Sequence, residues 1–165
     1  MSRTLLVGLP GAGKSTLAAR LVGPVVALDD IRRATSDATP AGDYHARSLF
    51  FRECQERQQA VFEFNGAGSH RHAARLALSM VAVPLRIVYL RVPVDMARRR
   101  VAERGTHVPH PNYGVDAVTA FGQMAETLER DFAEGYWSAR ADWVAIALDG
   151  TLSIDELTNQ LEVLS

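Results

Sequence analysis

Cysteine and lysine are almost missing from this sequence. Among 165 residues there is one cysteine, Cys54, and one lysine, Lys14, whereas arginine occurs 17 times. A single cysteine excludes an intrachain disulfide and a zinc cluster built on cysteines. It is typical of a reducing compartment, and we expect Cys54 to be a small buried hydrophobic residue rather than a reactive thiol.

The sequence also lacks a long apolar run and an excess of charge. No stretch approaches the roughly 18 apolar residues of a membrane helix. Arg3 leads directly into a predicted strand rather than a secretory signal, so we expect a cytoplasmic protein with no membrane partner. The formal net charge is −1, which argues against an extended groove for long nucleic acid. A short nucleic-acid end or a small molecule remains open as a partner.

One motif dominates what is present. Gly8–Thr16 fills the P-loop pattern G-x-x-x-x-G-K-S/T without a mismatch, between a predicted strand and a predicted helix. Its glycines let backbone N–H groups wrap phosphates, while Lys14 should reach the β- and γ-phosphates and Ser15 should ligate Mg²⁺. The single lysine thus stands where a compact ammonium is needed. We expect ATP and Mg²⁺ to be bound by Gly8, Pro10, Gly11, Ala12, Gly13, Lys14, Ser15 and Thr16.

Apolar runs alternate with helical segments, which predicts a parallel sheet covered by helices on both faces. The predicted strands are Thr4–Val7, Val25–Leu28, Ala60–Phe64, Leu85–Val92 and Trp143–Leu148. The predicted helices are Lys14–Val22, Tyr44–Gln59, Ser69–Val81, Val94–Arg104, Asp116–Glu134 and Ile154–Leu164. Ser153 and Glu156 form a capping box for the last helix. The fold class is α/β, a three-layer α/β/α sandwich with five strands, in one domain over residues 1–165.

Two segments interrupt this alternation. Thr35–Gly42 is rich in Ser, Thr, Asp, Pro and Gly and is predicted as a loop after the second strand. Gly105–Gly114 contains two prolines and two glycines and is predicted as a short lid. Both fall on the carboxyl side of the sheet, where ligands bind in open α/β folds.

Asp29 and Asp30 follow the second predicted strand directly, with Arg32 close behind. A carboxylate at this position could accept the proton of an attacking hydroxyl, and the arginine could hold the acceptor. The alternative is structural, with the carboxylates beginning a short helix as N-cap groups. Because adjacent side chains point to opposite sides, we expect only one of these carboxylates to face the phosphates and the other to cap the following turn.

Glu63 and Asn65 end the third predicted strand and share one face, since strand side chains alternate. Glu63 is a candidate to bind Mg²⁺ through water or to orient the acceptor, and Asn65 is a candidate to hydrogen-bond the acceptor. The alternative for Glu63 is a structural salt bridge.

Four arginines lie on the helix before the predicted lid. Arg100 and Arg104 are one turn apart on one face and could clamp the triphosphate and stabilise the transferred charge. Arg98 and Arg99 are interpreted as a solvated basic face.

These residues resemble the small P-loop phosphotransferases of the polynucleotide-kinase branch, which is close to zeta toxins and antibiotic O-phosphotransferases. The resemblance implies a sheet of the adenylate-kinase type with strand order 2-3-1-4-5. It also implies Asp29 as general base, so that we expect Asp30 to cap the following turn. It further implies Arg32 on the acceptor side and Arg104 as a lid arginine on the phosphates. It rests on the P-loop, on Asp29-Asp30-Ile31-Arg32 as a D-D-Y-R element, on Arg100 and Arg104, on Val108-Pro109 and on Glu134-Gly135-Tyr136.

The sequence departs from that branch at two places. Where the branch reads V-V-D-A-T-N, this chain reads Val61-Phe62-Glu63-Phe64-Asn65, which moves the carboxylate by one position. His107 stands where a further lid arginine is expected. The first change touches the acceptor side and the second the phosphate clamp.

We therefore expect an ATP·Mg²⁺-dependent kinase that phosphorylates a hydroxyl group. A polynucleotide 5′-hydroxyl is the leading acceptor, and a small metabolite or antibiotic hydroxyl is the alternative. The rival outside this class is a nucleotide-binding regulator or slow NTPase, although the sequence has no N-K-x-D guanine signature.

Overall fold

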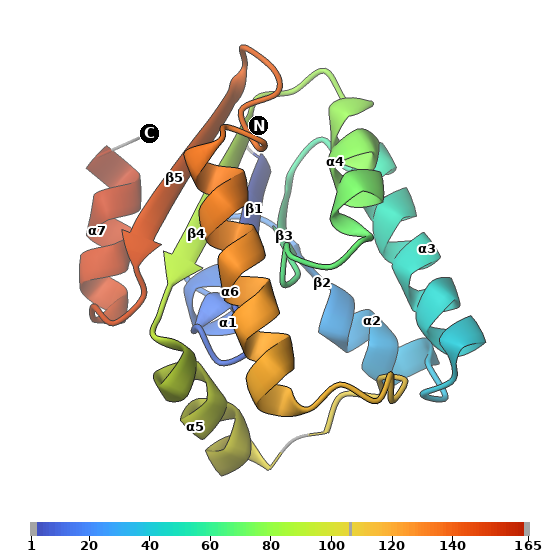
Figure 1. Cartoon of the computed structure of the whole chain (residues 1–165). Helices are drawn as coiled ribbons and strands as arrows, with labels where there is room; N and C mark the ends of the chain where they lie inside the picture. Colours follow the sequence, from blue (N-terminus) through green and yellow to red (C-terminus); the bar gives the residue numbers. More distant parts are fainter. Residues whose placement is uncertain (1–2, 106, 164–165) are drawn as a thin grey trace.

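The computed structural model describes residues 3–105 and 107–163 of the chain. Five parallel strands form one sheet in the order β2-β3-β1-β4-β5, which confirms the predicted sheet and its strand order. Because all strands run the same way, their carboxyl ends meet at one edge (Figure 1). The strands are β1 (Arg3–Val7), β2 (Val25–Ala27), β3 (Ala60–Glu63), β4 (Leu85–Arg91) and β5 (Trp143–Asp149).

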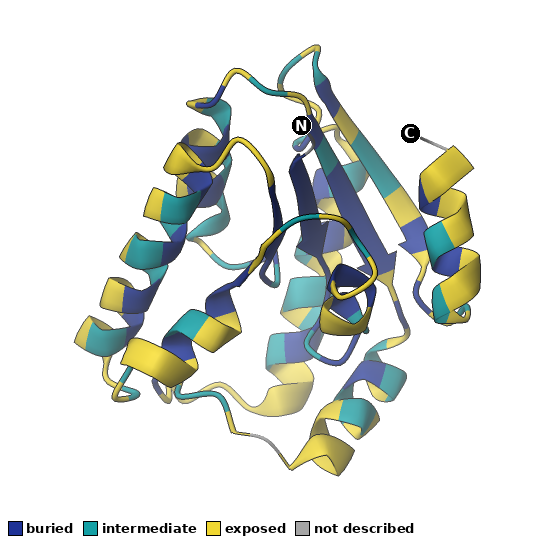
Figure 2. Cartoon of the chain, turned by 180° about the vertical axis from the view of Figure 1, so that it is seen from behind, coloured by how far each residue is buried: buried dark blue, intermediate teal, exposed yellow. Residues whose placement is uncertain are grey.

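Helices lie on both faces of the sheet (Figures 1 and 2). α1 and α7 contact each other on one face, α6 crosses the other, and α3 packs beside α4 near β2. The predicted three-layer sandwich is therefore confirmed. Within the described residues, no helix has the length and apolarity needed to cross a bilayer. The helices are α1 (Lys14–Ala18), α2 (Leu28–Thr35), α3 (Pro40–Glu56), α4 (Arg71–Ser79), α5 (Val94–Arg104), α6 (Ala117–Ala133) and α7 (Ile154–Val163).

The central strands are mostly apolar because helices cover both of their faces. All five residues of β1 and all four of β3 are buried, and Figure 2 shows these strands in dark blue. Cys54 on α3 has no exposed surface, and burial raises the pKa of its thiol. The expectation of a small buried residue at this position is confirmed.

The predicted loop Thr35–Gly42 is only partly a loop. Pro40 begins α3, and Thr39 is its N-cap, with the Thr39 hydroxyl accepting a hydrogen bond from Gly42 N at 3.1 Å. Proline suits the first turn of a helix because its missing N–H would have no partner there. The prediction started this helix too late because it treated Pro40 and Gly42 as loop signals.

The helix after the P-loop is shorter than predicted. The prediction extended it to Val22, whereas α1 ends at Ala18. The N–H groups of Arg20 and Leu21 bond to carbonyls three residues back, so the chain tightens beyond Ala18.

Two other boundaries concern the second strand and the last helix. Leu28, predicted as the end of the second strand, is the first residue of α2. The capping box is confirmed, because Ser153 N donates to Glu156 at 2.9 Å and Glu156 N donates to the Ser153 hydroxyl at 3.3 Å. Leu164, the predicted end of that helix, lies outside the described residues.

Candidate active site

The P-loop joins β1 to α1 and fits tightly against its neighbours. Gly8 N donates a hydrogen bond to the Asn65 carbonyl at 3.2 Å, which ties the loop to the end of β3. Gly11 has a φ of +84°, and a Cβ there would lie 2.4 Å from the Ala97 carbonyl oxygen of α5. Only glycine fits this contact, so the loop backbone is fixed between the sheet and α5.

The rest of the predicted nucleotide loop leads into α1. Ala12 is buried, and Gly13, with a φ of +95°, is the residue before the helix. Ser15 and Thr16 are exposed in the first turn of α1. Pro10 lines the cavity described below.

Lys14 is buried and folds back over the loop. Its Nζ donates to the carbonyl oxygens of Gly8 and Leu9, both at 3.0 Å. Burial lowers the pKa of Lys14, the charges of Glu63 and Asp29 oppose that shift, and Arg104 adds to it. The ammonium is therefore poorly solvated and lies within the field of both carboxylates, an environment that favours additional anionic partners.

Ser15 and Glu63 meet beside Lys14. The Ser15 hydroxyl donates to Glu63 Oε1 at 2.8 Å, whereas Glu63 Oε2 is buried without a hydrogen-bond partner among the described residues. Burial raises the pKa of Glu63, while Lys14 and the Ser15 hydrogen bond oppose the shift. A hydroxyl and a carboxylate with an unused oxygen match the hard oxygen donors that Mg²⁺ prefers, so these residues fit the ion.

Asp29 lies at the exposed end of a chain of paired charges. Arg32 donates to Asp29 at 3.0 Å and to Asp43 on α3 at 2.8 Å. The side chains of Arg32 and Asp43 are only 6% and 3% exposed, whereas that of Asp29 is 50% exposed. The guanidinium therefore links a buried carboxylate to one that faces open space, and it fixes where Asp29 lies.

Sequence reasoning did not identify Asp43. Asp43, Ala46, Phe50 and Cys54 are the buried residues of α3, at a spacing that puts them on one face. A carboxylate among these inward-facing positions needs a charged partner, and this need could have identified Asp43 as a candidate. It was missed because the predicted helix began at Tyr44.

The expectation that Asp30 caps a helix is wrong. The N-cap of α2 is Ala27, and no side chain caps this helix. Asp30 lies in the first turn and forms an exposed ion pair with Arg33 at 2.6 Å. α2 begins at Leu28, directly after β2, so Asp30 is already the third residue of the helix and cannot be its N-cap.

The two arginines of the proposed clamp differ in position. Arg100 donates to the Gly11 carbonyl at 3.2 Å, so it contacts the P-loop directly. Arg104 is exposed at the end of α5, near enough to lower the pKa of Lys14 through its charge. Arg98 pairs with Asp95 at 3.7 Å on the helix surface, in keeping with a solvated face.

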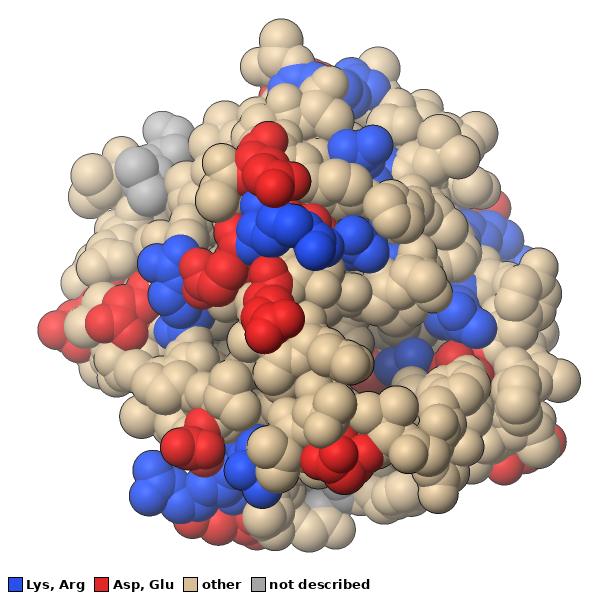
Figure 3. Space-filling model, in the orientation of Figure 1, with Lys and Arg blue, Asp and Glu red and all other residues tan. Residues whose placement is uncertain are grey.

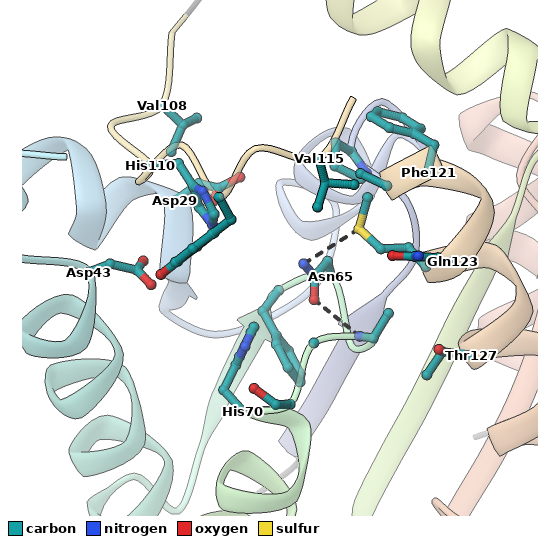
Figure 4. Close-up of a pocket in the computed structure, with 18 of the residues that line it drawn as sticks. Asp29, Asp43, Asn65, His70, Val108, His110, Val115, Phe121, Gln123 and Thr127 are labelled. Carbon is teal, nitrogen blue, oxygen red and sulfur yellow. Dashed lines mark hydrogen bonds between the residues drawn. The ribbon is translucent and has the colours of Figure 1, made fainter. Parts of the chain in front are cut away.

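A cavity of about 970 Å³ opens at the carboxyl edge of the sheet. It brings together five residues singled out from the sequence, namely Lys14, Asp29, Arg32, Glu63 and Asn65. Asn65 Oδ1 accepts from Ala67 N at 3.1 Å and its amide nitrogen lies 3.7 Å from Met124 Sδ (Figure 4).

The predicted lid and α6 form the outer wall of this cavity. His107, Val108 and His110 line it from the lid, while Thr106 of the same segment lies outside the described residues. Gly105 and Gly114, which bound the lid, have φ values of +59° and +73°. Gln123 and Thr127 line the cavity from α6 and were not predicted, because an amphipathic helix pattern does not tell a cavity from a packed core.

His70 lies at the floor of the cavity (Figure 4). Its ring packs on Phe64, with centroids 5.7 Å apart, and its Nε2 is buried without a partner among the described residues. Burial, together with the charges of Arg32 and Arg47, lowers the pKa of His70 to about 4. The imidazole is therefore uncharged at neutral pH.

Comparisons with known proteins agree on the fold. A family model described as AAA domain (AAA_33) matches residues 4–130. No sequence among curated proteins matches the chain. Many solved structures are similar over nearly the whole chain, at identities that show the fold alone, and three of them illustrate the range.

The first is shikimate kinase from Acinetobacter baumannii in complex with shikimate, with a TM-score of 0.68, 18% identity and coverage of 99% of this chain and 92% of that chain. The second is deoxyadenosine kinase from M. mycoides with bound dATP, with a TM-score of 0.62, 14% identity and coverage of 97% and 99%. The third is a gluconokinase from Sinorhizobium meliloti 1021, with a TM-score of 0.58, 14% identity and coverage of 96% and 88%.

Proposed function

We propose that this chain, which belongs to the AAA domain family, transfers the γ-phosphoryl group of ATP to a hydroxyl of a small molecule. The observation that carries the proposal is the convergence of Lys14, Glu63 and Asp29 at one cavity. A phosphate-binding lysine, a metal-side carboxylate and a half-exposed carboxylate are the groups that phosphoryl transfer to an alcohol needs.

ATP and Mg²⁺ are the cofactors of a P-loop of this kind. The loop amides, Lys14 and Arg100 would hold the phosphates, with Thr16 at the loop's end and Arg104 supplying positive charge from the lid side. Ser15, and Glu63 through water, would hold Mg²⁺, which neutralises charge on the β- and γ-phosphates. The hydrogen bond between Ser15 and Glu63 and the unused Glu63 oxygen support this arrangement.

Asp29 is the proposed general base. As the acceptor oxygen forms its bond to the γ-phosphorus, the hydroxyl proton passes to the Asp29 carboxylate. The bond from the γ-phosphorus to the bridging oxygen breaks, and ADP leaves. Arg32 supports this role by holding Asp29 at 3.0 Å, and Asn65 would face the acceptor.

A small acceptor fits better than the polynucleotide 5′-hydroxyl that the sequence resemblance favours. The lid and α6 wall the cavity on its outer side. Figure 3 shows acidic and basic side chains interspersed over one face, without a continuous basic stripe among the described residues. The three similar structures are a shikimate kinase, a deoxyadenosine kinase and a gluconokinase, each named for a small substrate.

Incubation with γ-labelled ATP, Mg²⁺ and a panel of acceptors tests the proposal. The panel holds nucleosides, sugars, hydroxylated metabolites and 5′-hydroxyl oligonucleotides. We expect label on a small molecule, and none with Lys14→Ala. Release of free phosphate alone would identify an NTPase or regulator, and label on the oligonucleotides alone would restore the polynucleotide assignment.

A further inference from the structure

The arginines of the cavity are already matched by carboxylates. Arg32 bonds Asp29 at 3.0 Å and Asp43 at 2.8 Å. Arg47 on α3 pairs with the second oxygen of Asp43 at 3.2 Å. An acceptor that drew either arginine away would leave Asp43, 3% exposed, with only one of its two partners, which is costly.

The remaining charged groups of the cavity also balance. Arg130 and Glu126 both line it from α6, one turn apart, so their opposite charges offset each other. His70, at the floor, has a pKa of about 4 because burial and the charges of Arg32 and Arg47 disfavour its protonated form. It is uncharged at neutral pH, so it forms no ion pair with an anion.

Uncharged polar groups line the cavity from α6 and from the segment that follows β3. Gln123 and Thr127 are one turn apart on α6 and share the cavity with Ser69 and Asn65. Among the described residues, none hydrogen-bonds the exposed amide of Gln123, which leaves two donors and an acceptor for a ligand. Figure 4 shows Gln123 and Thr127 on α6, to the right of Asn65.

Apolar side chains also line the cavity. Phe64 does so from the end of β3, Phe121 and Met124 from α6, and Val115 from the segment before α6. The cavity thus offers hydrogen-bonding groups next to hydrophobic surface, an arrangement that orients a ring with polar substituents.

We propose that the acceptor is an uncharged molecule with several hydroxyl or amide groups along one edge and a largely apolar ring face. Nucleosides and other neutral glycosides belong to this class, whereas carboxylic acids and phosphate esters do not. This inference rests on the proposed function, since it names the substrate class of the same site.

Matched pairs of acceptors that differ in one anionic group test the charge preference. The pairs are a nucleoside with its 3′-monophosphate, and a methyl glycoside with the corresponding uronic acid. We expect kcat/KM for transfer from ATP to favour the neutral member by about tenfold or more. Preference for the anionic member of the pairs would overturn the inference while leaving the kinase assignment intact.

Binding gives a readout that does not need turnover. Each pair is titrated calorimetrically into protein that holds a non-hydrolysable ATP analogue, and the neutral member should bind more tightly. If no acceptor is phosphorylated, the proposed function fails. Binding still decides the charge preference, and equal or tighter binding of the anionic members, or no binding of any member, contradicts it.

A charge introduced at Gln123 makes the test specific to this surface. Gln123→Arg should move the preference toward the anionic member by about tenfold, because it adds a positive charge to the cavity wall beside the acceptor. Gln160→Arg on α7 is the matched control and should leave the preference unchanged. A Gln123→Arg protein with the wild-type preference would show that the acceptor does not reach α6.

Discussion

At the scale of single residues, two adjacent carboxylates have different surroundings. Asp29 faces the cavity and is held by Arg32, whereas Asp30 pairs with Arg33 at the surface. Since a general base contributes about 10²–10⁴-fold, Asp29→Asn should lower kcat by that order with little change in ATP affinity. Asp30→Asn should keep near wild-type turnover, because it loses only an exposed ion pair.

Turnover of both variants at saturating ATP and acceptor measures this difference. A dead Asp30→Asn enzyme beside an active Asp29→Asn enzyme would place the base one residue later. Two active variants would remove this pair from the chemistry.

Asp43 should matter for folding before it matters for catalysis. Replacing it with alanine leaves Arg32 and Arg47 without their shared partner in a largely buried position. We expect Asp43→Ala to lower the free energy of unfolding by about 3 kcal/mol, in the range for a broken buried ion pair. Urea denaturation of this variant and of the exposed control Asp30→Ala gives the comparison. A loss no larger than the control's would mean that Arg32 finds enough compensation in Asp29.

At the scale of elements, the segment between α5 and α6 should respond to nucleotide. Gly105 and Gly114 both have positive φ and flank residues that line the cavity. We expect amides of residues 107–115 to exchange more slowly with solvent when a non-hydrolysable ATP analogue and Mg²⁺ are bound. Hydrogen exchange followed by mass spectrometry measures this, with Lys14→Ala as the non-binding control. Equal exchange with and without the analogue in the wild type would contradict a closing lid.

The elements also show why the sequence predicts some boundaries better than others. The capping box of α7 uses local side-chain bonds, so a local pattern reveals it. The start of α3 was misjudged because proline and glycine serve both loops and first turns. The end of α1 depends on a change of hydrogen-bond register beyond Ala18, which residue spacing does not encode.

At the scale of the whole molecule, alternating apolar runs and one motif predict the parallel sheet and the nucleotide loop, and the strand order follows from the family resemblance. The rest of the acceptor side could not be predicted, because it depends on contacts between distant elements. Asp43 meets Arg32 only when α3 packs beside α2, and Gln123 lines the same cavity as Asn65 only when α6 covers the carboxyl edge of the sheet. The roles of individual site residues remain predictions.

Stability of the whole fold should depend on pH through His70. Its folded pKa of about 4 lies below the ordinary value of 6.5, so the fold favours the neutral ring. This contribution is fully present above pH 6.5 and is lost as the pH falls toward 4. The difference of the two values corresponds to about 3 kcal/mol. The raised pKa of Glu63 acts in the opposite direction, because protonation relieves its burial, so wild-type data alone do not isolate His70.

A variant without the titrating ring separates the two groups. His70→Phe keeps an aromatic ring against Phe64 and removes the buried, unpartnered Nε2. Its free energy of unfolding should fall less steeply than that of the wild type between pH 6.5 and 4, whereas the exposed control His45→Phe should follow the wild-type slope. Urea denaturation at several pH values measures the three slopes. Parallel curves for wild type and His70→Phe would mean that the His70 ring is solvated in the folded protein, and the floor of the cavity would then be open to water.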